Sequence, residues 1–172
     1  MLAYSTISHM GFFLLGILSG TLSGYSAAMF YVMIYAVVSV GTFGCILYLT
    51  AEGFEADKLE DYRGLSEKQP WLAFFLLLFM FSLAGIPPTV GFYAKLSILQ
   101  AVIGAELLWV AIPSVIFAVI GAFYYLRVVK LMYFDKAESD GIARRFVPGP
   151  NSRALLLLNG LFTVAVMPWV GS

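Results

Sequence analysis

The chain has 172 residues, of which 61% are hydrophobic and only 12% are charged, and its mean hydropathy is +0.90. A soluble domain carries about twice that charged fraction, so the composition indicates an integral membrane protein in contact with a lipid bilayer. Ten Lys and Arg residues balance ten Asp and Glu residues, so net charge points to no nucleic-acid partner. With Cys45 as the single cysteine, a disulfide within the chain is excluded. We expect Cys45 to act as a small buried apolar residue.

Five apolar segments can be drawn along the chain, each near or above the roughly 20 residues that a membrane-crossing helix needs. They cover residues 2–20, 25–50, 71–103, 107–134 and 154–170. The sequence therefore predicts an all-α fold, a polytopic membrane helix bundle with about five transmembrane segments. The first segment lacks the basic region and cleavage site of a signal peptide. Small residues such as Gly41 and Gly121 are expected to allow close helix approach.

The third segment, 71–103, is too long for one straight helix and too short for two spans joined by a loop. Gly85, Pro87 and Pro88 interrupt it, because a proline lacks an N–H and its ring clashes with the preceding turn. A simple kink is the structural alternative. Two prolines with a glycine favour an unwound turn, and broken helices at mid-membrane are typical of ion transporters. The sequence therefore predicts a broken helix.

The placement of basic residues decides how many times the third segment crosses the membrane. If it is one broken span, the connections 51–70 and 135–153 lie on one side, and the opposite connections contain no Lys or Arg. This is the positive-inside pattern, so we expect a cytoplasmic N-terminus and a periplasmic C-terminus. The basic residues on the cytoplasmic side are Lys58, Arg63, Lys68, Arg127, Lys130, Lys136, Arg144, Arg145 and Arg153.

Lys95 is the one basic residue that this topology leaves inside the membrane. It lies ten residues before Ala105, where the segment ends, or about 15 Å along a helix. The hydrocarbon core is about 30 Å thick, so Lys95 is expected near the midplane. A lysine paired with a carboxylate is the structural alternative, but the apolar segments contain no Asp or Glu, and Glu106 lies at an edge. Because an unpaired buried ammonium is costly, Lys95 is a candidate proton carrier.

Polar side chains on the first two segments form a second candidate site. Ser5, Thr6 and His9 are three or four residues apart and share one helical face. The imidazole suits proton relay, and a satisfied packing histidine is an equal alternative. A polar stripe on the second segment should face the bundle interior, either as interhelical hydrogen bonding or with some water contact. The stripe consists of Tyr31, Tyr35, Ser39 and Thr42.

Sites for redox groups are missing from the sequence. It contains no Gly-rich nucleotide loop, no cysteine cluster for iron–sulfur and no pair of histidines spaced for haem. We therefore expect no cofactor or metal bound by this chain. Any electrons involved in its function would be carried elsewhere.

Several motifs in combination resemble the antiporter-like membrane subunits of respiratory complex I, most closely subunit N of bacterial NADH–quinone oxidoreductases. The resemblance covers essentially the whole chain. The matching motifs are Ala3-Tyr-Ser-Thr-Ile-Ser-His-Met-Gly11, Asp61-Tyr-Arg-Gly-Leu65, Leu83-Ala-Gly-Ile-Pro-Pro-Thr-Val-Gly-Phe92 with Lys95, and Gly121-Ala-Phe-Tyr-Tyr-Leu-Arg-Val-Val129.

The resemblance implies a longer protein with two inverted repeats, each containing a broken helix, of which residues 1–172 would be the C-terminal part. Lys95 matches the lysine of the second broken helix, and His9 matches a histidine near a central hydrophilic axis. In such a complex the oxidation of NADH drives proton translocation. The resemblance places NADH, FMN, iron–sulfur clusters and quinone in other subunits, and it implies the other membrane subunits of the complex as partners in the bacterial inner membrane.

The function favoured at this point is that of a membrane subunit of a proton-translocating NADH:quinone oxidoreductase without a redox centre of its own. Lys95 would carry the proton, and His9 would relay it with Ser5, Thr6 and Tyr35. One alternative is a cation/proton antiporter subunit, which uses the same fold without redox coupling. The other is a non-functional truncated membrane fragment, because Met1 resembles an internal methionine used as a start.

Overall fold

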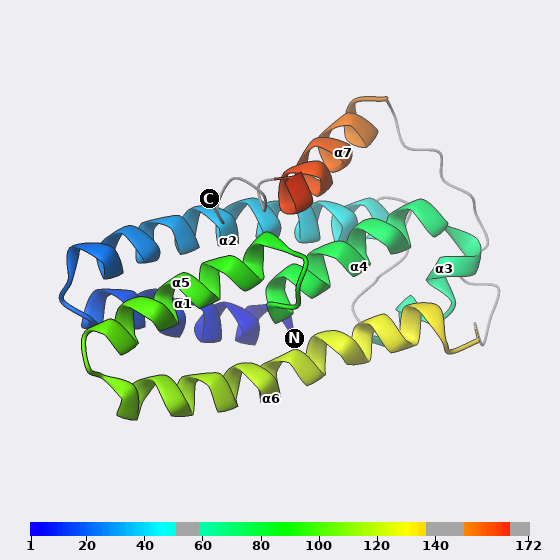
Figure 1. Cartoon of the computed structure of the whole chain (residues 1–172). Helices are drawn as coiled ribbons and strands as arrows, with labels where there is room; N and C mark the ends of the chain where they lie inside the picture. Colours follow the sequence, from blue (N-terminus) through cyan, green and yellow to red (C-terminus); the bar gives the residue numbers. More distant parts are fainter. Residues whose placement is uncertain (51–58, 137–149, 166–172) are drawn as a thin grey trace.

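A computed structural model describes residues 1–50, 59–136 and 150–165, and the regular structure in these ranges is helical (Figure 1). The predicted all-α fold is thereby confirmed. The elements are α1 (Leu2–Leu18), α2 (Leu22–Thr50), the 3₁₀ helix η1 (Leu59–Tyr62), α3 (Leu65–Lys68), α4 (Pro70–Ala84), α5 (Val90–Gly104), α6 (Leu108–Tyr133) and α7 (Pro150–Ala165).

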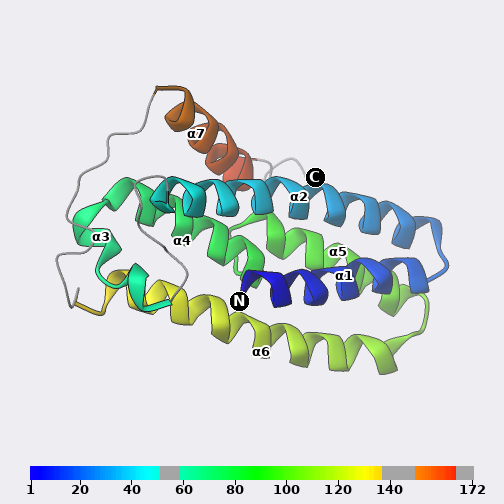
Figure 2. The same ribbon diagram turned by 180° about the vertical axis from the view of Figure 1, so that it is seen from behind.

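The longer helices run side by side, and α2 is the longest of them. It packs against α1, α4, α5 and α7, while α6 packs mainly on α4 (Figures 1 and 2). Both views place η1 and α3 at the end of the bundle where α6 finishes, and the Gly64 N–H donates to the Leu131 carbonyl there at 3.2 Å. The α1–α2 and α5–α6 turns lie at the opposite end.

The third apolar segment is interrupted between α4 and α5, and Gly85 ends α4 before either proline is reached. Gly85 takes a left-handed conformation with φ +78°, its N–H donates to the Ser82 carbonyl, and the Ile86 N–H donates to the Phe81 carbonyl. This pair of bonds is the Schellman arrangement that closes a helix at a glycine. Pro87 and Pro88 follow in the connection, which ends at Thr89, the N-cap of α5.

Two helices in the described ranges are long and apolar enough to cross a membrane, Leu22–Leu49 and Leu108–Tyr133. Leu2–Leu18, α4, α5 and Ala154–Val164 are shorter apolar helices. The break explains why α4 and α5 are short, since each has 15 residues. At 1.5 Å per residue, each is about 22 Å long, less than the roughly 30 Å hydrocarbon core.

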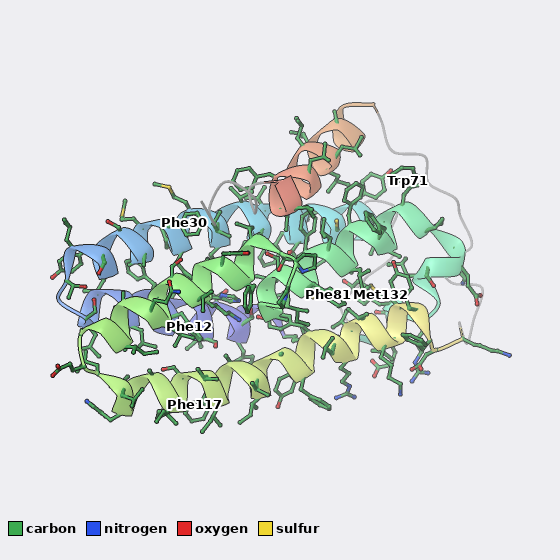
Figure 3. All side chains as sticks on the ribbon, in the orientation of Figure 1. Phe12, Phe30, Trp71, Phe81, Phe117 and Met132 are labelled. Carbon is green, nitrogen blue, oxygen red and sulfur yellow. The ribbon has the colours of Figure 1, made fainter. Side chains whose placement is uncertain are left out.

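The core lies between α2, α4 and α5, and the outer side of α6 is apolar. Phe79, Ile98 and Met132 are fully buried, and Met132 lies between α4 and α6 (Figure 3). Phe117 on α6 is 67% exposed and projects away from the bundle. An exposed apolar surface of this kind suits lipid rather than water. Cys45 is fully buried, as expected for a small apolar residue.

Two local predictions differ from the structure. The last helix begins at Pro150, earlier than the predicted residue 154, because a proline at the first helical position loses no intrahelical hydrogen bond. Gly41 is a site of close approach, since a Cβ there would lie 2.6 Å from Phe79 Cζ, but a Cβ at Gly121 would meet no atom within 4 Å. Lys58, Arg144, Arg145 and residues 166–170 lie outside the described residues, and the Arg153 side chain is not described.

Candidate functional site

His9 lies buried on α1, where tyrosines from α2 and α6 enclose its ring. Its Nδ1 is 2.7 Å from the Tyr31 hydroxyl, and its Nε2 is 3.2 Å from the Tyr125 hydroxyl. The Tyr35 ring stacks on the imidazole with 4.6 Å between centroids. A neutral imidazole has one donor and one acceptor nitrogen, so one tyrosine hydroxyl accepts from the ring while the other donates to it.

Ser5 and Thr6, which lie one turn before His9, join the same network. Ser5 Oγ shares a hydrogen bond with the Tyr125 hydroxyl, and the Tyr35 hydroxyl donates to Thr6 Oγ1 at 2.9 Å. A continuous hydrogen-bonded chain therefore runs from the Tyr31 hydroxyl through His9 and Tyr125 to Ser5. Hydroxyls and imidazoles can each donate and accept, so such a chain can pass a proton.

Lys95 is half-buried on α5 and reaches back across the helix break. Its Nζ donates to the Leu83 and Ala84 carbonyls, both at 2.9 Å, and lies 5.5 Å from the centroid of the Phe12 ring. Leu83 and Ala84 belong to the last turn of α4, whose carbonyls have no partner within their own helix. The partial negative charge at this helix end favours a cation.

Gly85 and Lys95 form one structural unit. A Cβ built on Gly85 would lie 2.8 Å from Lys95 Cδ and 3.2 Å from Nζ, so the lysine side chain packs directly over the glycine. The break thus supplies both the carbonyls that hold the ammonium and the space through which the side chain passes. Pro87 and Pro88 are exposed and border neither cavity of the site, so they contribute through the backbone.

Two cavities connect the lysine and histidine regions. The larger, of about 620 Å³, opens between α1 and α6, and the smaller, of about 10 Å³, lies between α2, α4 and α5. Both His9 and Lys95 border each cavity. Within the described ranges, no Asp or Glu lines either cavity, and no group of three or more His, Cys, Asp or Glu residues could hold a metal. The groups present are suited to holding and moving protons.

The structure places Ser5, His9, Tyr35 and Lys95 around these cavities, and Thr6 is linked to them through the Tyr35 hydroxyl. Part of the predicted polar stripe does not join them, since Thr42 Oγ1 donates to the Val38 carbonyl of its own helix. Sequence reasoning missed Tyr125, which supplies the second partner of His9. The available signal was its place on the inward face of α6, three, four and seven residues before the buried residues Val128, Val129 and Met132.

Residues 1–121 match the family model described as "NADH:quinone oxidoreductase/Mrp antiporter, TM". The chain belongs to this family. The matched range includes α1, α2, the α4–α5 break with Lys95, and the first half of α6. The resemblance found in the sequence motifs is thus confirmed, and the chain is a multi-pass membrane protein of this family.

Relatives within the family include subunit N of NADH-quinone oxidoreductase from Thioalkalivibrio sulfidiphilus, 55% identical over 166 residues that cover 96% of this chain and 34% of the relative. Subunit N from Nitrosomonas europaea is 53% identical over 161 residues, which cover 94% of this chain and 33% of that relative. Respiratory complex I from Thermus thermophilus with bound aureothin contains a similar chain, with TM-score 0.79 and 29% identity over 99% of this chain and 38% of that one. The chain spans about a third of the length of the curated relatives it matches.

Proposed function

We propose that the chain is part of a membrane subunit of a proton-translocating NADH:quinone oxidoreductase in the bacterial inner membrane. The observation that carries this proposal is Lys95, an ionisable residue held at a helix break beside the buried His9 network. An ionisable group in such a position is expected to serve transport, because burial is otherwise costly. Relatives named NADH-quinone oxidoreductase subunit N support the choice of reaction.

Electron transfer belongs to other subunits in this proposal. NADH, FMN, the iron–sulfur clusters and quinone would be bound elsewhere in the complex, and this chain would contribute part of the proton path. Its partners would be the other membrane subunits, in keeping with the complex I assembly in which the similar Thermus thermophilus chain is found. The subunit is then part of an enzyme without holding its redox centres.

In the proposed topology, α1, α2, α4 with α5, α6 and α7 form five spans, and α4 with α5 is a single broken span. Support comes from Arg63, Lys68 and Lys130, which lie directly after η1, in α3 and near the end of α6. These elements lie together at one end of the bundle (Figure 1). By the positive-inside rule this end faces the cytoplasm, with the N-terminus cytoplasmic and the C-terminus periplasmic. Lys95 then lies near the midplane.

The geometry suggests how the proton would move. The Leu83 and Ala84 carbonyls stabilise the Lys95 ammonium, and hydrogen bonds to a charged donor are stronger than those to a neutral one. When Lys95 releases its proton, His9 relays it through the Tyr125 hydroxyl to Ser5, which borders the larger cavity. Tyr35 and Thr6 hold the imidazole in place by stacking and by their own hydrogen bond.

A cation/proton antiporter is the second candidate, because the matching family also includes Mrp antiporters. Membrane vesicles from a strain that lacks the gene for the longer protein distinguish the two. For the oxidoreductase, the vesicles lose NADH-driven proton uptake linked to quinone reduction, and the restored gene returns it. If that uptake persists and sodium-driven proton exchange is lost instead, the antiporter function is the correct one.

Tyr125→Phe in the longer protein is expected to slow proton translocation several-fold while the complex still assembles. The change removes the hydroxyl that joins His9 to Ser5, and one such hydrogen bond contributes about 1 kcal/mol. Proton uptake by vesicles during NADH oxidation measures the effect. Tyr133→Phe on the same helix is the matched control, because Tyr133 borders neither cavity. Equal rates in the two variants would contradict a relay through Tyr125.

A further inference from the structure

The Ser82 hydroxyl is a buried polar group whose hydrogen bonds are not accounted for. Ser82 lies in the last turn of α4 and is only 2% exposed, and its Oγ has no hydrogen-bond partner among the described residues. Ser97 and Ser114 each donate instead to the carbonyl four residues earlier in their own helix. A buried hydroxyl without a partner costs free energy, so a native structure is expected to provide one.

The smaller cavity lies directly against this hydroxyl. Its volume of about 10 Å³ is close to the least that a single water molecule needs. Ser82, Lys95, Tyr31, Tyr35 and His9 supply its polar lining. A buried water is stable where it has two to four polar partners, and three of these side chains, those of Ser82, Lys95 and Tyr31, have hydrogen-bonding capacity for it.

Two neighbouring groups also have hydrogen-bonding capacity left over. A lysine ammonium has three N–H donors, and Lys95 gives two of them to the Leu83 and Ala84 carbonyls. The Tyr31 hydroxyl can donate and accept, and one of these functions is taken by His9 Nδ1. We propose that Ser82 holds one water molecule that joins the third N–H of Lys95 to the Tyr31 hydroxyl. Ser82 is then a positioning residue for proton exchange, an assignment that rests on the proposed function.

The water completes a proton path in which every step is balanced. The Lys95 ammonium gives a proton to the water oxygen while the water gives one of its own to the Tyr31 oxygen. The Tyr31 O–H proton passes to His9 Nδ1, and His9 Nε2 releases its proton to the Tyr125 oxygen as the Tyr125 O–H proton passes to Ser5 Oγ. The Ser5 O–H proton then passes to a water molecule in the larger cavity. Lys95 ends neutral, each relay group regains its original number of protons, and one proton arrives at the Ser5 side of the larger cavity.

The surroundings restrict the site to one small neutral ligand. The cavity volume of about 10 Å³ leaves no room for a larger molecule, and Gly91 forms part of its wall. The Lys95 ammonium borders the same space and repels a cation. Ile34, Val38 and Ala94 form the apolar remainder of the wall. A single water fits both the volume and the charge.

A cryo-electron microscopy map of the whole complex, at a resolution that shows buried waters, tests the site directly. We expect density within hydrogen-bond distance of Ser82 Oγ and Lys95 Nζ in the wild type. The density should be missing in Ser82→Ala, which is nearly isosteric and leaves the other groups in place. A wild-type map that resolves other buried waters but lacks this one would overturn the proposal.

Rates provide the second test. Ser82→Ala is expected to slow NADH-driven proton uptake about five-fold, the factor for one lost hydrogen bond, and to increase the solvent deuterium isotope effect. Ser97→Ala is the matched control, because the Ser97 hydroxyl bonds its own helix and borders neither cavity. A wild-type rate and isotope effect in Ser82→Ala, with Lys95→Ala inactive, would refute the water site and leave the proposed function standing. Wild-type rates in both variants would refute both.

Discussion

Gly91→Ala is expected to prevent stable assembly of the subunit. A Cβ at this position would overlap the Ser82 carbonyl oxygen and lie 2.7 Å from the Ser82 carbonyl carbon. Both atoms belong to the backbone of α4, which cannot rotate away as a side chain can. The start of α5 would therefore have to move off α4, at a cost of at least about 3 kcal/mol, the upper part of the range for overpacking. Blue native electrophoresis of membranes measures the amount of assembled complex.

Gly104→Ala supplies the control on the same helix. A Cβ at Gly104 would meet no atom within 4 Å, so this variant should assemble as well as the wild type. Alanine is also the better helix former, by up to about 1 kcal/mol. If Gly91→Ala assembled to the same extent as Gly104→Ala, the close packing of α5 on α4 would not be required for stability.

Lys95→Ala is expected to abolish proton translocation in an assembled complex, and Lys95→Arg is expected to do the same. The arginine keeps a positive charge that can donate to the Leu83 and Ala84 carbonyls, so it should preserve the end of α4. It cannot release its proton in a protein, whereas lysine can. The two variants therefore separate a proton carrier from a cation that only caps a helix.

Proton uptake by vesicles, measured together with complex content, distinguishes these roles. An arginine variant that pumps at the wild-type rate would show that Lys95 acts through its charge and hydrogen bonds alone. Lys130→Ala is a suitable control for loss of a basic side chain. Lys130 is 70% exposed and lies 4.0 Å from Asp135, and an exposed pair of this kind contributes about 1 kcal/mol at most.

The sequence was sufficient to predict the helical fold, which depends on local chemistry, namely apolar runs of helical length. The glycine and two prolines of the third segment lie between α4 and α5, and the assignment of these helices to one broken span remains a prediction. The sequence also predicted that Ser5, Thr6 and His9 share a face, because helical spacing determines this within one element. The structure adds the hydrogen bond that the Tyr35 hydroxyl donates to Thr6 Oγ1. Roles in proton transfer remain predictions that the variants above test.

Other parts of the site depend on contacts between distant segments, which spacing cannot reveal. Tyr125 and His9 are 116 residues apart, so no local pattern pairs them. The apolar segments contain no carboxylate that could pair with Lys95, and the structure shows that its ammonium donates to two backbone carbonyls instead. The Leu83 and Ala84 carbonyls are available to Lys95 because α4 ends inside the helix bundle, which leaves the carbonyls of its last turn without a partner in their own helix. Likewise, the three-dimensional structure is needed to see that Ser82 Oγ has no hydrogen-bond partner among the described residues.

The two hydrogen bonds from Lys95 to the end of α4 also link the protonation state of this lysine to the way α4 and α5 are held together. They cross the break, and together with the packing of Gly91 on Ser82 they tie one half-helix to the other. Charged hydrogen bonds are about twice as strong as neutral ones, so the tie weakens when Lys95 becomes neutral. The stiffness of the joint between α4 and α5 therefore varies with the occupancy of a single titratable atom. A force applied to α5 by a neighbouring helix would, by the same linkage, change how tightly that proton is held.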